Sequence, residues 1–156
     1  MRSTELNSLL GDVPWVDLLS QHNAIVRACL AAHEGNEVKH TGDGLFAVFD
    51  SPAQAVACGL DITSRFPLAS LTDASVTVNV CIGITAGEPV ETDDDLFGLS
   101  VTKAFRMSSR AKPGEVLVTD ALRALARGDG FRFTYRGMFA LKGFKDRERL
   151  FEVSRA

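Results

Sequence analysis

Apolar and polar positions recur along the chain with two periods, and each period predicts one kind of element. Apolar side chains spaced three and four residues apart predict helices at 14–33, 52–66, 98–110 and 120–127. Runs rich in β-branched and aromatic residues predict strands at 37–41, 45–49, 76–85, 115–119, 131–141 and 149–153. The remaining stretches, above all the polar segment 67–75 and the acidic segment 91–95, are predicted to be loops.

The order of these elements predicts an α/β fold. Helices and strands alternate, but several strands follow one another as hairpins. This pattern is typical of a sandwich with a mixed or antiparallel sheet and not of a doubly wound parallel sheet. The 156 residues suffice for one buried core, and no internal repeat or linker divides them. We therefore expect residues 1–156 to form a single domain.

Composition and charge narrow the classes of function. Apolar residues make up 46% of the chain and charged residues 24%, the balance of a soluble globular domain. The formal net charge of −3 disfavours a general nucleic-acid binder, which carries a basic excess. No apolar run is long enough to span a bilayer, and the first ten residues lack the apolar core of a signal peptide. Three widely spaced cysteines within apolar runs disfavour a disulfide or metal role and favour a reducing cytoplasm; they are Cys29, Cys58 and Cys81.

The most informative triplet is Gly42-Asp43-Gly44, at the bend of the hairpin predicted for 37–49. Asp-Gly is good turn chemistry, and the triplet alone favours a simple turn. The flanking glycines also leave the carboxylate of Asp43 unobstructed, so that a rigid hairpin tip can aim it at a metal ion. The segments around the triplet favour this second interpretation.

Residues 37–49 closely resemble the metal-binding hairpin of class III adenylate and guanylate cyclases. The resemblance continues along nearly the whole chain. Residues 15–27 resemble the first helix of that family, and residues 83–88 resemble its central strand and the turn after it. Further matches follow in the same order at 112–118, 141–143 and 150–153. Several independent matches in the right order make the resemblance specific.

Resemblance to this family implies a ferredoxin-like α+β core and a head-to-tail homodimer with both active sites at the subunit interface. It also implies conversion of ATP to 3′,5′-cyclic AMP and pyrophosphate, in which the ribose 3′-hydroxyl attacks the α-phosphorus. Two metal ions, Mg²⁺ or Mn²⁺, activate the hydroxyl and neutralise the triphosphate in such a reaction. Cationic side chains stabilise the charge of the phosphoryl group in flight.

Three residues match the metal and purine positions of the family. Asp43 corresponds to the second of two aspartates that hold both metals. Lys39, four residues earlier on the same strand face, corresponds to a lysine that reads the purine, and its ammonium suits a ring-nitrogen acceptor of adenine. Asp95 corresponds to the second purine reader and would accept a hydrogen bond from the exocyclic amine. Lys39 and Asp95 together form the pair that adenylate-type members carry. The alternative for Lys39 is an exposed lysine on a strand, and the alternative for Asp95 is a solvated acidic loop.

The helix predicted at 98–110 resembles the transition-state helix of the family. Arg106 matches the arginine that stabilises the pentavalent phosphorus, a role that suits a permanently charged, planar guanidinium. Thr102 stands where the family often carries a ribose-orienting asparagine, and this departure weakens the expected ribose contact. Lys142 resembles the lysine that contacts the outer phosphates. A surface arginine and a solvated basic turn are the alternatives for Arg106 and Lys142.

The largest departure from the family lies at the start of the sequence. In family members the first metal aspartate lies on an opening strand, in a segment resembling Phe-x-Asp-Ile-x-Gly-Ser-Thr. Ser3 and Thr4 match the end of this segment and are assigned to substrate binding, whereas the strand and its aspartate are missing. We expect very weak cyclase activity, because Asp43 alone faces the metals. We also expect residues 45–49 and 76–85 to expose strand edges, so that a swapped strand or a compensating shift is needed.

Three functions remain in competition. An adenylate cyclase domain agrees with the five polar matches at Lys39, Asp43, Asp95, Arg106 and Lys142. A catalytically inactive cyclase-like module, which binds nucleotide or acts by dimerisation, agrees with the missing aspartate and with Thr102. A diguanylate-cyclase relative is disfavoured, because the sequence contains no Gly-Gly-acidic-acidic-Phe turn.

Overall fold

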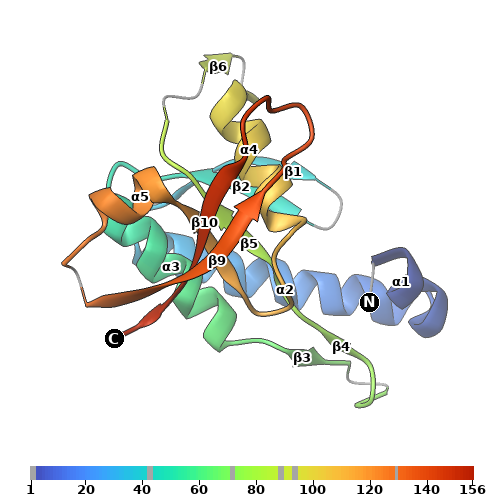
Figure 1. The fold of residues 1–156 in the computed structure, drawn as a ribbon. Coiled ribbons are helices and arrows are strands. Elements are labelled where there is room, and N and C mark those ends of the chain that lie inside the picture. The colour runs from blue at the N-terminus through green and yellow to red at the C-terminus, as the bar shows by residue number, and fades with distance from the viewer. Residues whose placement is uncertain (1–2, 42–43, 71–72, 88–89, 93–94, 129) are drawn as a thin grey trace.

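The computed structural model describes residues 3–41, 44–70, 73–87, 90–92, 95–128 and 130–156. The helices in these ranges are α1 (Ser3–Leu10), α2 (Asp12–Ala32), α3 (Pro52–Ser64), α4 (Leu99–Ser108) and α5 (Asp120–Leu125). The strands are β1 (Asn36–Thr41), β2 (Gly44–Val48), β3 (Leu68–Ala69), β4 (Thr77–Val78), β5 (Ile82–Ile84), β6 (Val90–Thr92), β7 (Asp95–Phe97), β8 (Val116–Thr119), β9 (Phe131–Phe139) and β10 (Glu148–Arg155). Figure 1 shows their arrangement.

The largest sheet is mixed and has the strand order β5-β8-β10-β9. β5 runs parallel to β8, whereas β10 is antiparallel to both β8 and β9. All four residues of β8 are buried, because this strand has a partner on each edge and helices α3, α4 and α5 pack against it. The α+β architecture with a mixed sheet confirms the predicted fold class.

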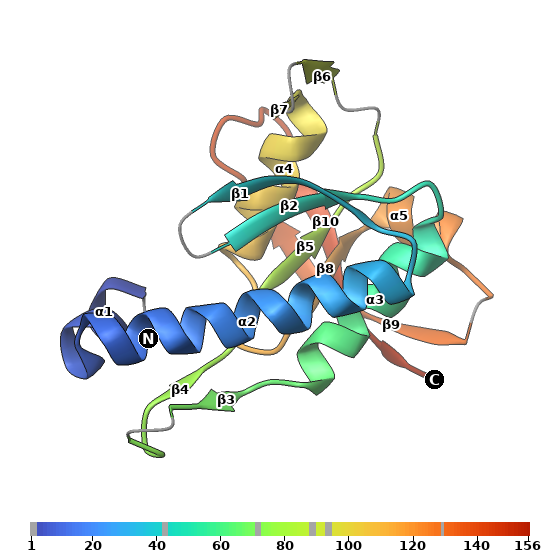
Figure 2. The same cartoon turned by 180° about the vertical axis from the view of Figure 1, so that it is seen from behind.

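Helices cover both faces of the strands. α2 and α3 lie side by side on one face, as Figure 2 shows, and bury an apolar cluster that includes Val26, Leu30 and Ile62. On the other face, Met107 of α4 packs with Leu117 and Leu150 of the sheet. Among the described helices, none is long and apolar enough to cross a membrane.

Local signals in the sequence explain where several elements begin. Ser51 accepts a hydrogen bond from the backbone N–H of Gln54 at 3.3 Å, so it caps α3 as the Ser-Pro pair predicts. Thr119 caps α5 in the same way through the N–H of Leu122. These caps place both helices within a residue or two of the positions predicted from the pattern.

Two predictions about the extended segments are wrong. The strand predicted at 76–85 is divided into β4 and β5, because β4 pairs with β3 outside the main sheet and only β5 joins β8. The acidic segment predicted as a loop at 91–95 instead contributes to the hairpin of β6 and β7, in which Thr92 lies opposite Asp95. Cross-strand pairing, which the residue types alone do not reveal, decides both outcomes.

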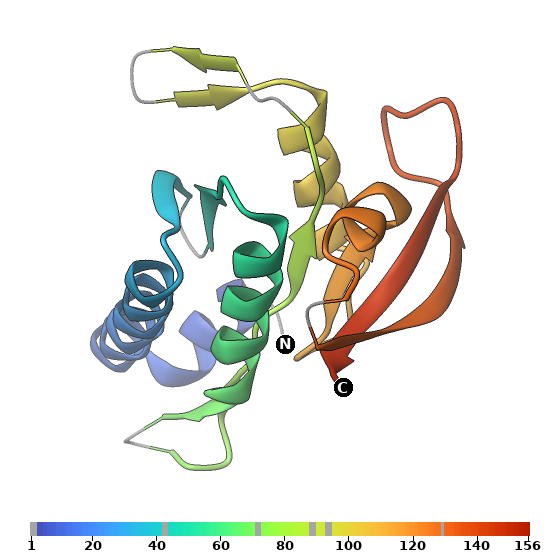
Figure 3. The same ribbon diagram turned by 90° about the vertical axis from the view of Figure 1, so that its left-hand side faces the viewer.

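The expected open edges are confirmed. Among the described residues, β2 pairs only with β1, and β5 pairs only with β8. The residues that begin the described chain form α1 and pack against α2, so they supply no strand to either edge. Figure 3 shows the β1–β2 hairpin on one side of β5 and the remaining strands of the main sheet on the other.

Candidate active site

The β1–β2 hairpin carries two of the predicted site residues. Lys39 lies on β1 opposite Phe46 of β2, just after an irregularity in the register. Arg27 of α2 fixes the base of the hairpin, because its guanidinium donates to both carboxylate oxygens of Glu37, at 2.8 and 3.0 Å. Asp43 lies outside the described residues, so its metal-binding role stays a prediction.

The second predicted purine reader lies on a neighbouring element. Asp95 begins β7, which is in contact with both β1 and α4. The backbone therefore brings the strand of Lys39, the strand of Asp95 and the helix of Arg106 to one region of the molecule. The side chains of Lys39 and Asp95 are not among those that the structure describes.

Helix α4 and the turn after it carry three cationic side chains. Lys103 and Arg106, three residues apart, lie on the same side of α4, and Arg110 follows in the turn after the helix. The guanidinium of Arg106 lies over the ring of Phe105, 5.5 Å from its centroid. The Nε atom of Arg106 is buried, and no hydrogen-bond partner reaches it from the described part of the chain. Arg106 thus keeps a desolvated donor that the described residues leave without a hydrogen bond.

Thr102 is less well suited to its predicted role. Its hydroxyl donates to the backbone oxygen of Gly98 at 3.3 Å, one turn earlier in the same helix. A threonine that bonds back to its own helix has its proton already engaged. Thr102 is exposed on α4, so only the two oxygen lone pairs of its hydroxyl are available to a ribose.

The loop between β9 and β10 lies beside α4. Lys103 forms an ion pair with Glu148 at 3.0 Å, and its ammonium lies 5.2 Å from the centroid of the Phe144 ring. Arg110 donates to the backbone oxygen of Ala140 at 3.3 Å. Lys142 is exposed in this loop, between these attachment points. The structure thereby brings the elements of Arg106 and Lys142 together.

Ser3 and Thr4 form the first turn of α1 instead of ending an extended segment. α1 packs against the start of α2. Their side chains are not described, so their assignment to substrate binding stays a prediction.

Metal ligands are sparse in the described part of the chain. No group of three or more His, Cys, Asp or Glu side chains there is arranged to hold a metal ion. Asp43 lies outside this part of the chain and stays the predicted metal ligand; a magnesium site commonly takes one or two carboxylates besides substrate phosphates and water.

Sequence reasoning missed a cavity near these elements. It measures about 590 Å³ and is lined by residues of β2, β5, α2, α3 and α4. One of these is Cys81, which is exposed and not enclosed as its apolar neighbours suggested; Cys29 and Cys58 are buried as expected. No local motif signals this cavity, because it is formed by segments distant in the sequence.

Comparison with known proteins agrees with this arrangement. The chain matches the adenylate and guanylate cyclase catalytic domain over residues 2–154. It is 33% identical over 128 residues to the pH-sensitive adenylate cyclase MT1302 of Mycobacterium tuberculosis (strain CDC 1551 / Oshkosh), a match that covers 76% of this chain and 30% of that protein. The chain spans less than two fifths of the length of the curated relatives it matches.

Solved structures give the same result for the fold. The adenylate/guanylate cyclase/hydrolase from Silicibacter pomeroyi superposes with a TM-score of 0.75 at 26% identity, covering 88% of this chain and 85% of that one. The adenylyl cyclase CyaB from P. aeruginosa superposes with a TM-score of 0.82 at 19% identity, covering 99% and 89%. The match over nearly all of the sequence, together with the fold, shows that this chain belongs to the adenylate and guanylate cyclase catalytic domain family.

Proposed function

We propose that residues 1–156 are a single adenylate cyclase domain that converts ATP to 3′,5′-cyclic AMP and pyrophosphate at a low rate. In this reaction the ribose 3′-oxygen gives up its proton and bonds to the α-phosphorus, and the bond from that phosphorus to the pyrophosphate oxygen breaks. The chain contributes positioning and electrostatic stabilisation, which dominate phosphoryl-transfer catalysis.

The observation that carries this proposal is the unpaired Nε of Arg106. A buried guanidinium donor without a partner is unfavourable, and it becomes favourable when an anion with the right geometry arrives. The ring of Phe105 supports the cation from one side. Arg106 is therefore arranged to meet a phosphoryl group whose charge increases in the transition state.

The β9–β10 loop beside α4 is the part of the chain that would contact the outer phosphates of ATP. The ion pair between Lys103 and Glu148 and the bond from Arg110 to Ala140 hold the β9–β10 loop against α4. Lys142, exposed between these attachments, is free to follow the leaving pyrophosphate as a mobile point charge.

Selection of ATP over GTP is assigned to Lys39 and Asp95. They lie on β1 and β7, which contact each other. A lysine donates to the ring nitrogen of adenine, and an aspartate accepts from its exocyclic amine, whereas guanine presents the opposite pattern at these positions.

Mg²⁺ or Mn²⁺, the metals of this family, would neutralise the triphosphate and lower the pKa of the 3′-hydroxyl when bound. Asp43 is the residue of this chain that would hold them. One carboxylate is a poor fit to a two-metal site, and this shortage is the reason for the low rate in our proposal.

A head-to-tail homodimer would complete the site. Two apolar side chains next to the catalytic face of α4 are exposed in the single chain: Leu99 is 75% and Phe105 is 48% accessible. Exposed apolar residues of this size beside a charged site favour burial against a partner. The partner in this proposal is a second copy of the chain.

Arg106 provides the test. We expect Arg106→Ala to lower cyclic AMP formation from Mn²⁺-ATP by at least about 100-fold, the loss typical of removing a transition-state donor. The control is Arg123→Ala in α5, which removes the ion pair to Asp120 and the contact with the Phe151 ring and should leave most of the activity. Equal activity of both variants would contradict the assignment.

Thermal unfolding with ATP, together with the activity of the unmodified chain, distinguishes the second candidate function, an inactive nucleotide-binding module. The bond from the Thr102 hydroxyl to Gly98 and the single metal carboxylate favour this alternative. It predicts that ATP binds and raises the unfolding temperature while no cyclic AMP forms from the unmodified chain.

A further inference from the structure

His33 lies where α2 ends and the chain turns towards the β1–β2 hairpin. It directly follows the last residue of α2, and β1 begins three residues later at Asn36. Figure 2 shows the chain passing from the end of α2 into β1. Residues 33–35 therefore set the angle between the helix and the hairpin.

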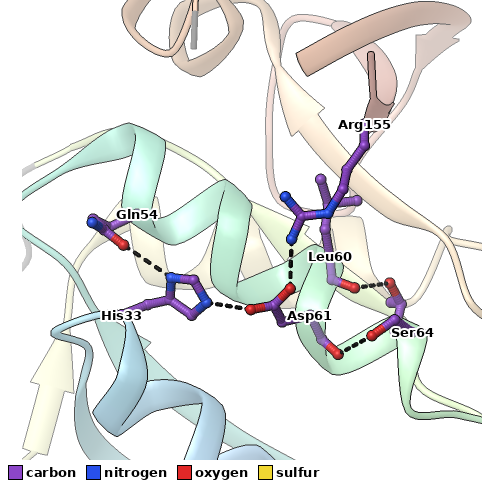
Figure 4. A network of polar contacts seen from close by, with 7 residues as sticks. His33, Gln54, Leu60, Asp61, Ser64 and Arg155 are labelled. Carbon is purple, nitrogen blue, oxygen red and sulfur yellow. Dashed lines mark hydrogen bonds and ion pairs between the residues drawn. The ribbon is translucent and has the colours of Figure 1, made fainter. Parts of the chain in front are cut away.

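The side chain of His33 is held at both ring nitrogens. Nε2 lies 2.5 Å from Oδ2 of Asp61, and Nδ1 lies 2.9 Å from Oε1 of Gln54, both on α3 (Figure 4). Asp61 also accepts a hydrogen bond from Arg155 of β10, the other charged group that acts on the ring. Only 16% of the His33 side chain is exposed. The ring cannot turn without losing a partly buried hydrogen bond, so His33 ties the end of α2 to α3.

The backbone connects this anchor to the hairpin through a closely defined turn. The N–H of His33 donates to the backbone oxygen of Cys29 at 3.1 Å and to that of Leu30 at 3.2 Å. The N–H of Gly35 also donates to the oxygen of Leu30, at 2.9 Å. Between them, Glu34 has a φ of 58°, a left-handed conformation that is uncommon for a residue with a Cβ atom. Such a turn leaves the hairpin little freedom to swing about α2.

The turn also packs directly on the hairpin. A Cβ atom on Gly35 would lie 2.6 Å from the ring of Phe49 and 2.9 Å from Cδ2 of Leu30. Phe49 follows the last residue of β2, so the backbone of the turn touches the end of the second strand just before it enters the first. A shift of His33 would therefore be transmitted to both strands.

The other polar anchor at the base of the hairpin is weaker. Arg27 and Glu37 form an ion pair at 2.8 Å, but their side chains are 52% and 27% exposed. Ion pairs in contact with water contribute little, because solvent and salt screen them. Of the two anchors, the network of His33 is the stronger restraint.

We propose that His33 is a positioning residue for nucleotide binding: through Asp61 and Gln54 it fixes the angle at which the β1–β2 hairpin leaves α2. The inference rests on the proposed function, because this hairpin carries the residues assigned there to the purine and the metal, Lys39 and Asp43. A hairpin that swings moves both residues. Affinity for ATP and the choice between ATP and GTP should therefore change together.

A merely structural role of His33 predicts a different result. Loss of stability alone lowers the amount of folded chain and hence the maximal rate. It leaves KM and the ratio of the two cyclic nucleotides unchanged, because these quantities do not depend on how much of the chain is folded.

The test compares His33→Ala with His22→Ala at pH 7, at a temperature where both variants are folded. His22 is the matched control, since it is a half-buried histidine of the same helix whose ring packs on Phe66, 5.5 Å away between centroids. We expect His33→Ala to raise KM for Mn²⁺-ATP at least about fivefold and to lower the ratio of cyclic AMP to cyclic GMP, whereas His22→Ala changes neither.

Hydrogen exchange, followed by mass spectrometry, examines the hairpin without relying on activity. Exchange at 36–41 and 44–48 should be at least about tenfold faster in His33→Ala, with 116–119 unchanged. His33→Gln, whose amide still donates to Asp61, should recover most of the protection and most of the affinity for ATP.

An unchanged KM, unchanged exchange in the hairpin, or exchange that rises equally at 116–119 would overturn the proposal. Failure of the proposed function is a separate outcome, in which the unmodified chain forms no cyclic AMP. The exchange at 36–41 and 44–48 then still decides whether His33 positions the hairpin.

Discussion

His33, at the end of α2, donates from Nε2 to Oδ2 of Asp61 on α3, at 2.5 Å. Its other ring nitrogen lies 2.9 Å from Oε1 of Gln54, and Arg155 of β10 donates to the second oxygen of Asp61 (Figure 4). One carboxylate thus ties α2, α3 and the last strand together. Both nitrogens of His33 face acceptors, which suits the protonated ring.

This network predicts how stability depends on pH. The hydrogen bond to Asp61 raises the pKa of His33, although burial and the nearby Arg155 oppose this shift. The bonds from His33 and Arg155 lower the pKa of Asp61 against its burial. The stabilisation from His33 is therefore full below about pH 6.5 and is lost as the pH rises through the raised pKa. The stabilisation from Asp61 is present above about pH 4 and is lost as the pH falls through the lowered pKa of Asp61.

The variant His33→Gln should unfold at a lower urea concentration than the unmodified chain at pH 6. The difference between the two midpoints should shrink towards pH 8.5, where the histidine is neutral in the unfolded and increasingly in the folded chain. His22→Gln is the control, because the hydrogen bond recorded for His22 is to the amide of Asn23 and not to a carboxylate. A difference that stays constant with pH would show that His33 contributes only packing.

The ion pair between Lys103 and Glu148 predicts an effect on phosphate binding. Both side chains are about one quarter exposed, so Glu148→Gln should lower stability only modestly, by about 1 kcal/mol or less. It should raise KM for ATP several-fold, because the loop of Lys142 is no longer held against α4. Arg123→Gln, which removes an ion pair within α5, is the control and should leave KM unchanged. Steady-state kinetics at a fixed Mn²⁺ concentration measure KM for both variants and the unmodified chain.

The close packing of Gly83 against α4 predicts an effect on stability. A Cβ atom at this position would lie 2.5 Å from the backbone oxygen of Ala104 and 2.8 Å from Cβ of Met107. Gly83→Ala should therefore force α4 away from β5 and destabilise the chain by about 1–3 kcal/mol. Gly59→Ala is the comparison: its Cβ would meet only flexible side-chain atoms at 3.3 Å or more, and alanine favours the helix. Urea unfolding measures the stability of both variants, and a Gly59→Ala variant less stable than Gly83→Ala would contradict this explanation.

The sequence predicts most elements because local signals place them. Ser51 with Pro52 sets the start of α3, and the apolar run 116–118 within the predicted strand 115–119 needs no partner to be recognised as a buried strand. The break between β4 and β5 could not be predicted, since it depends on which strand is available for pairing. The site was predicted from matching residues, whereas the buried Nε of Arg106 and the bond from Thr102 to Gly98 depend on packing that only the structure gives.

The central claim is that this cyclase domain acts on ATP. The most direct measurement supplies equal concentrations of ATP and GTP with Mn²⁺ and quantifies cyclic AMP and cyclic GMP in the same sample. The account predicts slow formation of cyclic AMP in clear excess, and loss of this excess in Lys39→Glu, whose carboxylate accepts where the ammonium donated. Cyclic GMP equal to or above cyclic AMP, or no product at all from the unmodified chain, would contradict it.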